Sequence, residues 1–284
     1  MVEVYVLTHQ GDTRTAVALT TVVSPTALSI EAAHALEGAP ASVALTRRSR
    51  LNLDLARAVD PDPAAAAAAL GARFADCRRC HLSERRDHVV QWRGNIDAVL
   101  VVVGDSPSVD DDHRGRPFVS PHGRLQDELF RDSGIDPEDD VVWMTTVGCR
   151  SCDSRIDVDR PPTRVEQIAC SERTLGLLRA LRPRVVLCLG AEAAGIFFDT
   201  PPPVNTWVTL TPDDAPEDWI AVGYARHPAY LMRSIIVPKQ YKEYAAAVRF
   251  YRRLKAKLAR LDKVTAWRFG LRYVETLDAP AVGG

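Results

Sequence analysis

The sequence lacks the features that would place it at once in several broad classes. Its 284 residues carry a formal net charge of −1, so the molecule as a whole is not a polycation, and any contact with nucleic acid must come from a local basic surface. No stretch approaches the roughly 18 consecutive apolar residues of a transmembrane helix. The N-terminus has no basic start followed by an apolar core, as a secretory signal would. These absences predict a cytoplasmic protein without a membrane span.

Cysteine is sparse, with six residues in the chain, and in a reducing compartment they make a poor disulfide framework. Metal or cluster ligation is therefore the better hypothesis. Cys77 and Cys80 form a C-x2-C pair, and Cys149 and Cys170 follow at a distance. Four thiolates can hold a zinc ion or an iron–sulfur cluster. The alternative is a set of ordinary core thiols, because free cysteine is commonly buried.

The two remaining cysteines have weaker assignments. Cys188 lies inside the apolar run VVLCLG, which predicts a buried strand residue. Cys152 forms a second C-x2-C pair with Cys149, so it can replace Cys149 as a ligand or simply line the loop.

The hydrophobic pattern predicts an α/β fold with three layers, α/β/α, around a mainly parallel sheet. From Ala98 onward, apolar strand-like runs alternate with helix-like segments, and a helix is expected near 239–262. Residues 1–70 form a small α+β extension with a connector, in which VEVYVLT, TAVALTTVV and 41–46 are expected strands and a short helix begins at Ser29. We expect the α/β domain over 71–265 and a C-terminal strand and tail over 266–284.

Three polar segments follow predicted strands of this sheet. GDSPSVDDDHRGRPFVSPHGRL follows AVLVVV, TTVGCR follows VVWM, and RHPAYLMR follows WIAVGYA. Ligands of parallel α/β sheets bind at the carboxyl ends of the strands. The three segments are therefore expected to converge on one site.

Five short motifs then appear in a fixed order. They are C-x2-C-x-L at 77–82, GDSPS at 104–108, GRPFV at 115–119, MTTVGCR at 144–150 and HPAYLMR at 227–233, with Cys170 before the last. In this order and spacing, the chain from Cys77 to Arg233 resembles the family-4 uracil-DNA glycosylases, which carry a [4Fe–4S] cluster.

The resemblance implies a monofunctional DNA glycosylase of base excision repair. Such an enzyme flips uracil or a related modified pyrimidine out of single- or double-stranded DNA and hydrolyses its N-glycosidic bond. It implies a monomer with DNA as its partner. It also implies that the quartet Cys77, Cys80, Cys149 and Cys170 holds a structural [4Fe–4S] cluster, with zinc as the alternative occupant.

The same resemblance assigns the catalytic residues. Asp105 stands where the family has Glu and would orient the water or stabilise the sugar cation, and the Ser106 hydroxyl can hold a water. His227 would give a hydrogen bond or positive charge to the departing base. The alternatives are a helix N-cap for Asp105 and Ser106 and a solvated loop for His227.

Two residues are assigned to the flipped base. Phe118 would stack on it, as the matching family Phe does; its alternative is an aromatic that plugs the core. Thr145 stands where the family has Asn, and a hydroxyl cannot make the paired donor and acceptor pattern of an amide. The neighbouring Thr146 faces the other way along the strand and is no substitute. The identity of the base is therefore open.

Other polar residues of the motifs face DNA in this interpretation or serve as scaffold. Tyr230, Leu231, Met232 and Arg233 would form a wedge into the duplex, or an ordinary helix start. Asp110, Asp111 and Asp112 are expected in a solvated turn, pairing with Arg116 or capping a helix, and His122 has no assigned role. Five arginines can meet phosphates or form a solvated basic surface: Arg78, Arg79, Arg85, Arg86 and Arg150.

Two further hypotheses follow from the departures at Thr145 and Asp105 and from the extra N-terminal unit. One is a superfamily member retuned to a different modified base. The other is a non-catalytic DNA-binding or damage-sensing protein that keeps the fold.

Overall fold

The computed structural model describes residues 2–10, 13–22, 44–46, 62–153, 156–210, 216–234 and 238–263. Its centre is a six-stranded sheet in the order β10-β11-β9-β5-β6-β4. The four inner strands are parallel, and the strand at each edge is antiparallel to its neighbour. The strands are β4 (Arg93–Gly94), β5 (Leu100–Gly104), β6 (Val141–Thr145), β9 (Val185–Leu189), β10 (Thr206–Leu210) and β11 (Ile220–Ala225).

The inner strands form because their residues are apolar on both faces. Every residue of β5, β6 and β9 is buried, which is typical of a parallel sheet covered on both sides. Successive residues alternate between two cores, so Val101 and Val103 pack into one, and Leu100 and Val102 into the other. The sheet thus has no solvent-exposed face at its centre.

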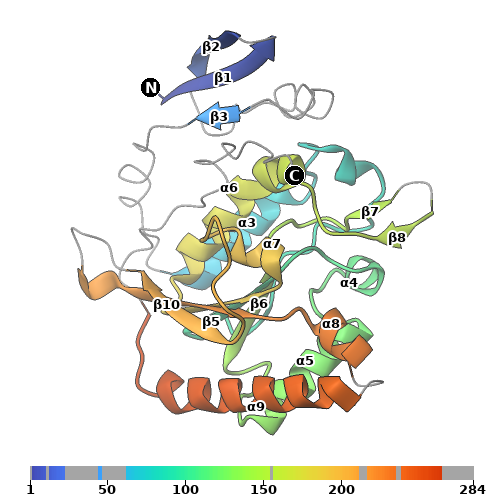
Figure 1. Cartoon of the computed structure of the whole chain (residues 1–284), viewed down its shortest axis with the longest axis vertical. Helices are drawn as coiled ribbons and strands as arrows, with labels where there is room; N and C mark the ends of the chain where they lie inside the picture. Colours follow the sequence, from blue (N-terminus) through green and yellow to red (C-terminus); the bar gives the residue numbers. More distant parts are fainter. Residues whose placement is uncertain are drawn as a thin grey trace.

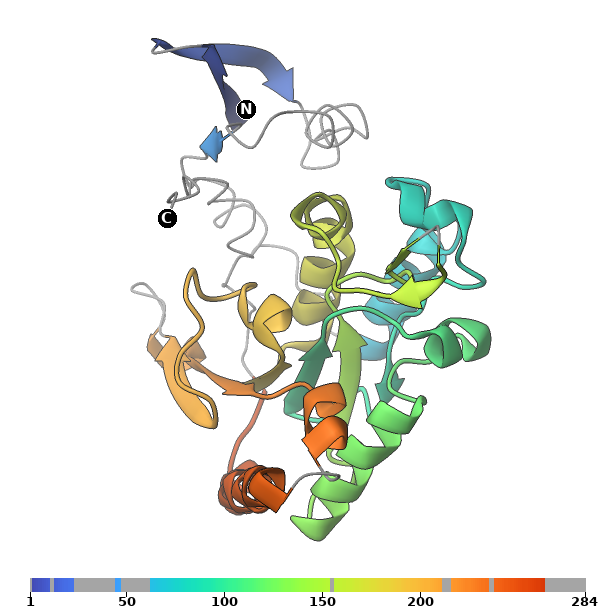
Figure 2. The same cartoon turned by 45° about the vertical axis from the view of Figure 1, so that its right-hand side comes forward.

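Helices cover both faces of the sheet (Figures 1 and 2). On one face lie α3 (Pro63–Phe74), α6 (Arg164–Leu181) and α7 (Ala191–Ala194). On the other lie α5 (Pro121–Asp132), α8 (Pro228–Ser234) and α9 (Pro238–Leu258). The predicted α/β/α architecture with a mainly parallel sheet is confirmed.

Short elements fill the loops that follow the strands. The helix α4 (Val109–Arg114) follows β5, and an antiparallel hairpin of β7 (Cys152–Asp153) and β8 (Val158–Asp159) follows β6. Single 3-10 turns, η2 (His81–Glu84) and η3 (Pro216–Asp218), follow the C-x2-C pair and precede β11. The hairpin, β4 and the edge strand β10 are elements that the hydrophobic pattern did not predict.

The N-terminal residues form a separate three-stranded antiparallel sheet in the order β2-β1-β3. Its strands are β1 (Val2–Gln10), β2 (Thr13–Val22) and β3 (Ala44–Thr46), which confirms the three expected strands. The helix expected from Ser29 and the strand expected after 265 lie outside the described residues.

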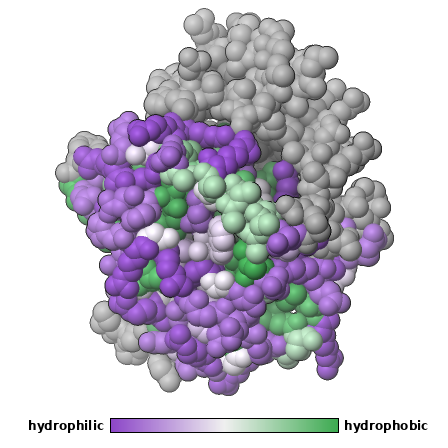
Figure 3. Space-filling model, turned by 180° about the vertical axis from the view of Figure 1, so that it is seen from behind, coloured by the Kyte–Doolittle hydropathy of each residue, from purple (hydrophilic) through white to green (hydrophobic). Residues whose placement is uncertain are grey.

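The surface of the described residues is mostly hydrophilic on the face seen from behind, with small apolar patches between polar areas (Figure 3). Among the described residues, three large apolar side chains are exposed: Ile156, Val158 and Met232. Within the described part of the chain, no helix is both long and apolar enough to cross a membrane.

Candidate active site

The parallel strands end at one edge of the sheet, and we call this the carboxyl edge. Asp105 follows β5, Thr145 ends β6, Gly190 follows β9 and His227 follows β11. Backbone pairing continues past the strands, because the Thr146 N–H donates to the Gly104 carbonyl at 2.9 Å and the Gly190 N–H to the Ala225 carbonyl at 3.0 Å. The edge therefore brings together the three polar segments that the sequence predicted to converge.

Asp105 has a carboxyl group in an unusual environment. No donor among the described residues bonds its Oδ1, which is buried. Gly190, at φ 101°, lies so close that an added Cβ would sit 3.0 Å from that oxygen. Burial, and then the negative charge of Glu192, raise the pKa of Asp105 to about 8, against a smaller lowering by the Ala193 N–H. At neutral pH the group is mostly a neutral acid that becomes a carboxylate on modest alkalinisation.

Ser106 is partly exposed beside it. The helix that follows is capped by Ser108, whose side chain accepts the Asp111 N–H while Asp111 accepts the Ser108 N–H. The cap is therefore not made by Asp105 or Ser106, and the alternative of an N-cap for these two residues was wrong.

Phe118 lies directly beneath the end of β5. A Cβ on Gly104 would come within 2.5 Å of its Cζ, and its ring centroid is 4.9 Å from that of Trp143. Phe118 has φ 58°, and Asp111 Oδ1 holds the next turn by accepting the N–H groups of Val119 at 2.7 Å and Ser120 at 3.3 Å. The ring packs in the core, and stacking on a base stays a prediction.

Thr145 is almost fully buried, and its hydroxyl donates to the Val147 carbonyl at 2.7 Å. The Thr146 hydroxyl donates to the Asp105 carbonyl at 2.5 Å. Both hydroxyl protons at the end of β6 are therefore used inside the protein.

A buried arginine on α6 holds the end of β6 in place. Arg173 of α6 donates to the carbonyls of Thr145 at 3.2 Å, Val90 at 2.6 Å and Gln91 at 2.9 Å. It is almost fully buried. The sequence offered no signal for this role, because a helical arginine is usually at the surface.

His227 begins the turn into α8. Its Nδ1 accepts the Ala229 N–H at 3.2 Å, so a neutral ring carries its proton on Nε2, which can act as a donor.

Of the predicted wedge, Leu231 is buried, Met232 is exposed and Tyr230 stacks under Arg226, whose Cζ lies 4.3 Å from the ring centroid. The side chain of Arg233 is outside the described residues.

Glu192 and Tyr224 are two titratable residues at this edge that the sequence interpretation missed. The charge of Glu192 acts on Asp105. Burial raises the pKa of Tyr224, Arg226 lowers it, and Glu192 and Asp105 raise it further. The sequence gave no hint of this because neither residue belongs to any of the five motifs.

Three of the four predicted ligand cysteines, Cys80, Cys149 and Cys170, gather in one small apolar cluster with Leu82 and Val147, and Cys77 is the partner of Cys80 in the C-x2-C pair. Burial raises the pKa of Cys80 and of Cys149 to about 12, and the negative charge of an ionised Cys170 adds to the effect on both. The charge of Cys77 also raises the pKa of Cys80. Cys152 lies on β7 instead, near Arg150 and Arg160, and Cys188 is fully buried in β9 as predicted. The geometry thus separates the quartet from the other two.

The surroundings of the quartet fit an iron–sulfur cluster. The Gly148 N–H donates to Cys170 Sγ at 3.3 Å, and the Arg86 guanidinium lies 3.8 Å from Cys149 Sγ; hydrogen bonds to the sulfurs are a normal part of such sites. Within the described ranges no three ligand-type side chains lie close enough to hold one metal ion. Zinc stays the alternative occupant of the quartet, because four thiolates can also hold a zinc ion.

Ion pairs tie the C-x2-C segment to α6, the helix that carries Cys170. Glu172 pairs with Arg73 and Arg79. Glu166, with a fully buried side chain, pairs with His81 at 2.9 Å and Arg160 at 2.5 Å. Of the five arginines offered for phosphate contact, Arg79 is thus paired, and Arg150 also pairs with Asp157 and Asp159.

The acidic run is part of the scaffold, but in a different form from that predicted. Asp111 and Asp112 are buried in α4, and Asp112 accepts the N–H groups of Asp87 and His88 at 3.0 Å each. Arg116 pairs with Glu138 at 3.6 Å. The expectation of a solvated turn paired with Arg116 was wrong, whereas the alternative of an acid that caps a helix holds for Asp111, which accepts the Ser108 N–H in the capping box of α4.

Comparison with known proteins decides the family. Residues 91–255 match the Uracil DNA glycosylase superfamily. The chain belongs to this superfamily. The match runs from just before β4 into α9, so it includes Asp105, Phe118, Thr145 and His227, whereas Cys77 and Cys80 precede it.

Several characterised superfamily members are similar in sequence. The type-4 uracil-DNA glycosylase of Thermotoga maritima is 37% identical over 166 residues, 57% of this chain and 81% of the relative. The type-4 uracil-DNA glycosylase of Archaeoglobus fulgidus is 37% identical, over 43% of this chain and 59% of the relative. The type-4 uracil-DNA glycosylase of Saccharolobus solfataricus is 28% identical, over 43% of this chain and 54% of the relative. The chain spans little more than half the length of the latter two.

Proposed function

We propose that the protein is a monofunctional DNA glycosylase that removes uracil or a related modified pyrimidine from DNA. The observation that carries the proposal is the placement of Asp105, Phe118 and His227 around one carboxyl edge in a member of this superfamily. The type-4 uracil-DNA glycosylase relatives support it. The working form is a cytoplasmic monomer that acts in base excision repair.

The proposed reaction is hydrolysis of the bond between the sugar C1′ and the base nitrogen of a flipped nucleotide. Ser106 holds a water, and the ionised Asp105 carboxylate takes a proton from it as its oxygen bonds to C1′. The bonding electrons leave with the base, and His227 Nε2–H stabilises the resulting negative charge. Phe118 forms the surface on which the base stacks.

The buried Thr145 hydroxyl favours a broader substrate range than uracil alone. It already donates to the Val147 carbonyl, so this strand end offers no side-chain amide or free donor to read the base edge. A site that makes few hydrogen bonds to a base rejects analogues only weakly. Pyrimidines with altered 4- or 5-substituents are therefore expected substrates.

We propose that Cys77, Cys80, Cys149 and Cys170 hold a [4Fe–4S] cluster. When bound, the cluster acts as a cross-link between the C-x2-C segment, the loop after β6 and α6. A purified protein that is brown and absorbs near 400 nm supports this, with iron near four per chain. A colourless protein that contains zinc contradicts it.

The test of function is a single-turnover assay on oligonucleotides that carry uracil, hydroxymethyluracil, hypoxanthine or thymine, single- and double-stranded. Abasic product from uracil and at least one modified pyrimidine, lost in His227→Ala, is the expected result. Product from only one other base supports the retuned alternative. Tight binding of damaged DNA without product from any base contradicts the proposal and supports a damage-sensing protein.

A further inference from the structure

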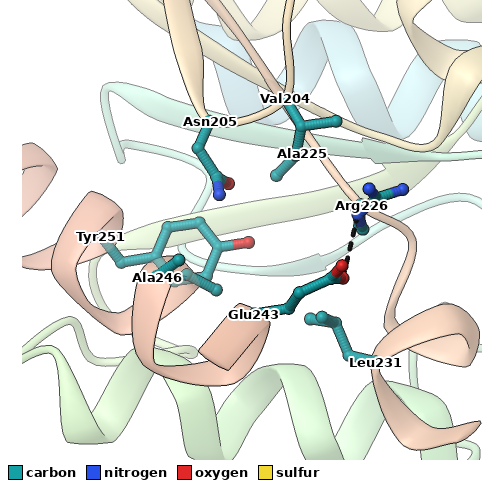
Figure 4. Close-up of a pocket in the computed structure, with 9 residues that line it drawn as sticks. Val204, Asn205, Ala225, Arg226, Leu231, Glu243, Ala246 and Tyr251 are labelled. Atoms are coloured by element: carbon teal, nitrogen blue, oxygen red, sulfur yellow. Dashed lines mark ion pairs between the residues drawn. The ribbon is translucent and has the colours of Figure 1, made fainter. Parts of the chain in front are cut away.

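A cavity of about 160 Å³ lies between the end of β11 and the helices α8 and α9. Its walls come from Val204, Asn205, Ala225, Arg226, Leu231, Glu243, Ala246, Ala247 and Tyr251. Figure 4 shows the tyrosine hydroxyl and the Asn205 amide pointing into the gap from opposite elements. Of these residues, only Leu231 was assigned a role from the sequence, as part of the expected wedge, and Arg226 directly precedes His227.

The polar groups of this cavity are buried and incompletely bonded. Tyr251 is fully buried, and within the described residues its hydroxyl has no hydrogen-bond partner of normal geometry. Burial raises the pKa of Tyr251, and nearby Gln126 lowers it, so the hydroxyl stays neutral. Gln126, which lies beside Tyr251 but does not line the cavity, is fully buried as well, and its amide makes no hydrogen bond of normal geometry within the described part of the chain. Unpaired buried groups are costly, which indicates that something polar occupies the space.

The charged groups at the cavity are already matched. Arg226 Nε lies 3.0 Å from Glu243 Oε2, and the Tyr230 hydroxyl lies 3.5 Å from the other carboxylate oxygen. Because Arg226 and Glu243 carry opposite charges and lie together, the described lining of the cavity has no net charge to attract a phosphate or an ammonium group, while Glu243 Oε2, which makes no hydrogen bond of normal geometry, can still accept one. The occupant is therefore expected to be neutral.

The size of the cavity sets a further limit. A cavity of about 150 Å³ holds one benzene ring, so 160 Å³ accepts a single six-membered ring, and a ring with a sugar attached exceeds that volume. Val204, Ala225 and Leu231 supply apolar walls for the ring faces. Asn205, Tyr251 and Glu243 supply donors and acceptors at its edge. A ring with both N–H and carbonyl groups satisfies all of them.

We propose that this cavity is a second site that binds a free pyrimidine base, the product of the proposed reaction. The choice of product rests on the proposed function, whereas the site itself does not. Ala225 and Arg226 lead into His227, and Leu231 lies on the helix that follows it. An occupied cavity thus contacts both sides of the His227 turn, so the released base inhibits the enzyme by more than competition with the substrate.

The test is binding of free uracil and cytosine to the full chain by ligand-observed NMR, with deoxyuridine as the size control. Tyr251→Phe removes the hydroxyl and keeps the ring, and Asn205→Asp removes the amide donor while keeping a residue suited to φ 63°. Phe118→Ala alters the proposed stacking surface and so weakens any base binding at the carboxyl edge. Base binding that remains in this variant belongs to the cavity. We expect Phe118→Ala to keep base binding and the two cavity variants to weaken it at least tenfold.

Equal binding by wild type and both cavity variants overturns the proposal, as does binding of deoxyuridine as strong as that of uracil. Water as the only occupant gives no base signal in any variant and also overturns it. Failure of the function has a different signature: bases still bind the cavity, but no oligonucleotide is cleaved. In an active enzyme, the base should give mixed inhibition in wild type and purely competitive inhibition in Tyr251→Phe.

Discussion

At the residue scale, the raised pKa of the Asp105 carboxyl group affects both the stability of the protein and the rate of the proposed reaction. Its pKa is about 8 in the folded chain and 3.8 for an ordinary aspartate. Between these values the folded protein keeps a proton that the unfolded chain has lost, so the free energy of unfolding falls as pH rises from about 4 to 8. The ionised form, which the proposed reaction needs, grows over the upper part of the same range.

We therefore expect the single-turnover rate to rise with pH, to be half of its maximum near pH 8 and to level off above about pH 9. Asp105→Asn should lower the rate by about 100- to 10,000-fold and raise the free energy of unfolding at pH 8 more than at pH 4. Asp110→Asn, in the same segment, is the matched control. Urea unfolding at both pH values and a pH–rate profile measure this; a flat profile in wild type would remove Asp105 as the base.

A second residue-scale prediction concerns base choice. Thr145→Asn introduces the amide of the family pattern and should shift the ratio of rates towards uracil over hydroxymethyluracil and thymine. Thr145→Val keeps the shape but leaves the Val147 carbonyl without its donor, so it should lower the free energy of unfolding by about 1–3 kcal/mol with no change in base preference. Rate ratios and urea unfolding of both variants, read together, test the role of the hydroxyl.

At the scale of elements, α6 links the cysteine cluster to the rest of the domain. Burial opposes ionisation of Glu166, but hydrogen bonds from Arg160 and Thr163 outweigh it and lower its pKa. Its contribution to stability is thus present at neutral pH and is lost as pH falls through that lowered pKa.

Glu166→Gln removes the charge from a buried position that faces His81 and Arg160. We expect the free energy of unfolding at pH 7 to fall by about 3 kcal/mol and iron to be lost faster to a chelator, followed at 400 nm. Glu128→Gln, at an exposed position on α5, should change neither. Unchanged iron release in Glu166→Gln would show that these ion pairs do not hold the C-x2-C segment in place.

The sequence predicted best the elements that consist almost entirely of apolar residues. The strands β5, β6 and β9 are uninterrupted apolar runs, so their burial followed from composition. The edge strand β10 was missed because TWVTL is only partly buried and its partner lies later in the chain. The bonds of Thr145, Asp111 and Arg173 were unpredictable for a related reason: each depends on a carbonyl or N–H that a distant turn brings into reach.

At the scale of the whole molecule, contacts of α3 define where the proposed glycosylase domain begins. Ala67 is fully buried in the core with α6, and Leu70 packs so closely that a Cβ on Gly176 would lie 2.9 Å from it. Asp62 caps α3. At the other end, Lys263 Nζ donates to the carbonyls of Ile96 at 2.6 Å and Leu181 at 2.8 Å. We therefore propose that the domain includes residues 62–263, so that it takes in α3, part of which the sequence interpretation assigned to the N-terminal connector.

A chain of residues 62–263 should fold cooperatively and excise the same bases as the full chain. A shorter chain, 62–260, loses both Lys263 hydrogen bonds and should have a melting temperature several degrees lower, since about 1–2 kcal/mol shifts a domain of this size by that much. Differential scanning calorimetry and the single-turnover assay compare the two. Loss of activity in 62–263 would assign the N-terminal sheet a part in the reaction.

The buried guanidinium of Arg173 joins two regions that are usually considered apart. One set of its bonds holds the segment that leads from the cysteine quartet into β4, and another holds the strand end that carries Thr145. An added Cβ on Gly148, next to Cys149, would lie 2.7 Å from its Nε. In the proposed enzyme, oxidation of the cysteine quartet would therefore also act, through Arg173, on the strand end that carries Thr145, so the rate of base excision would depend on redox conditions.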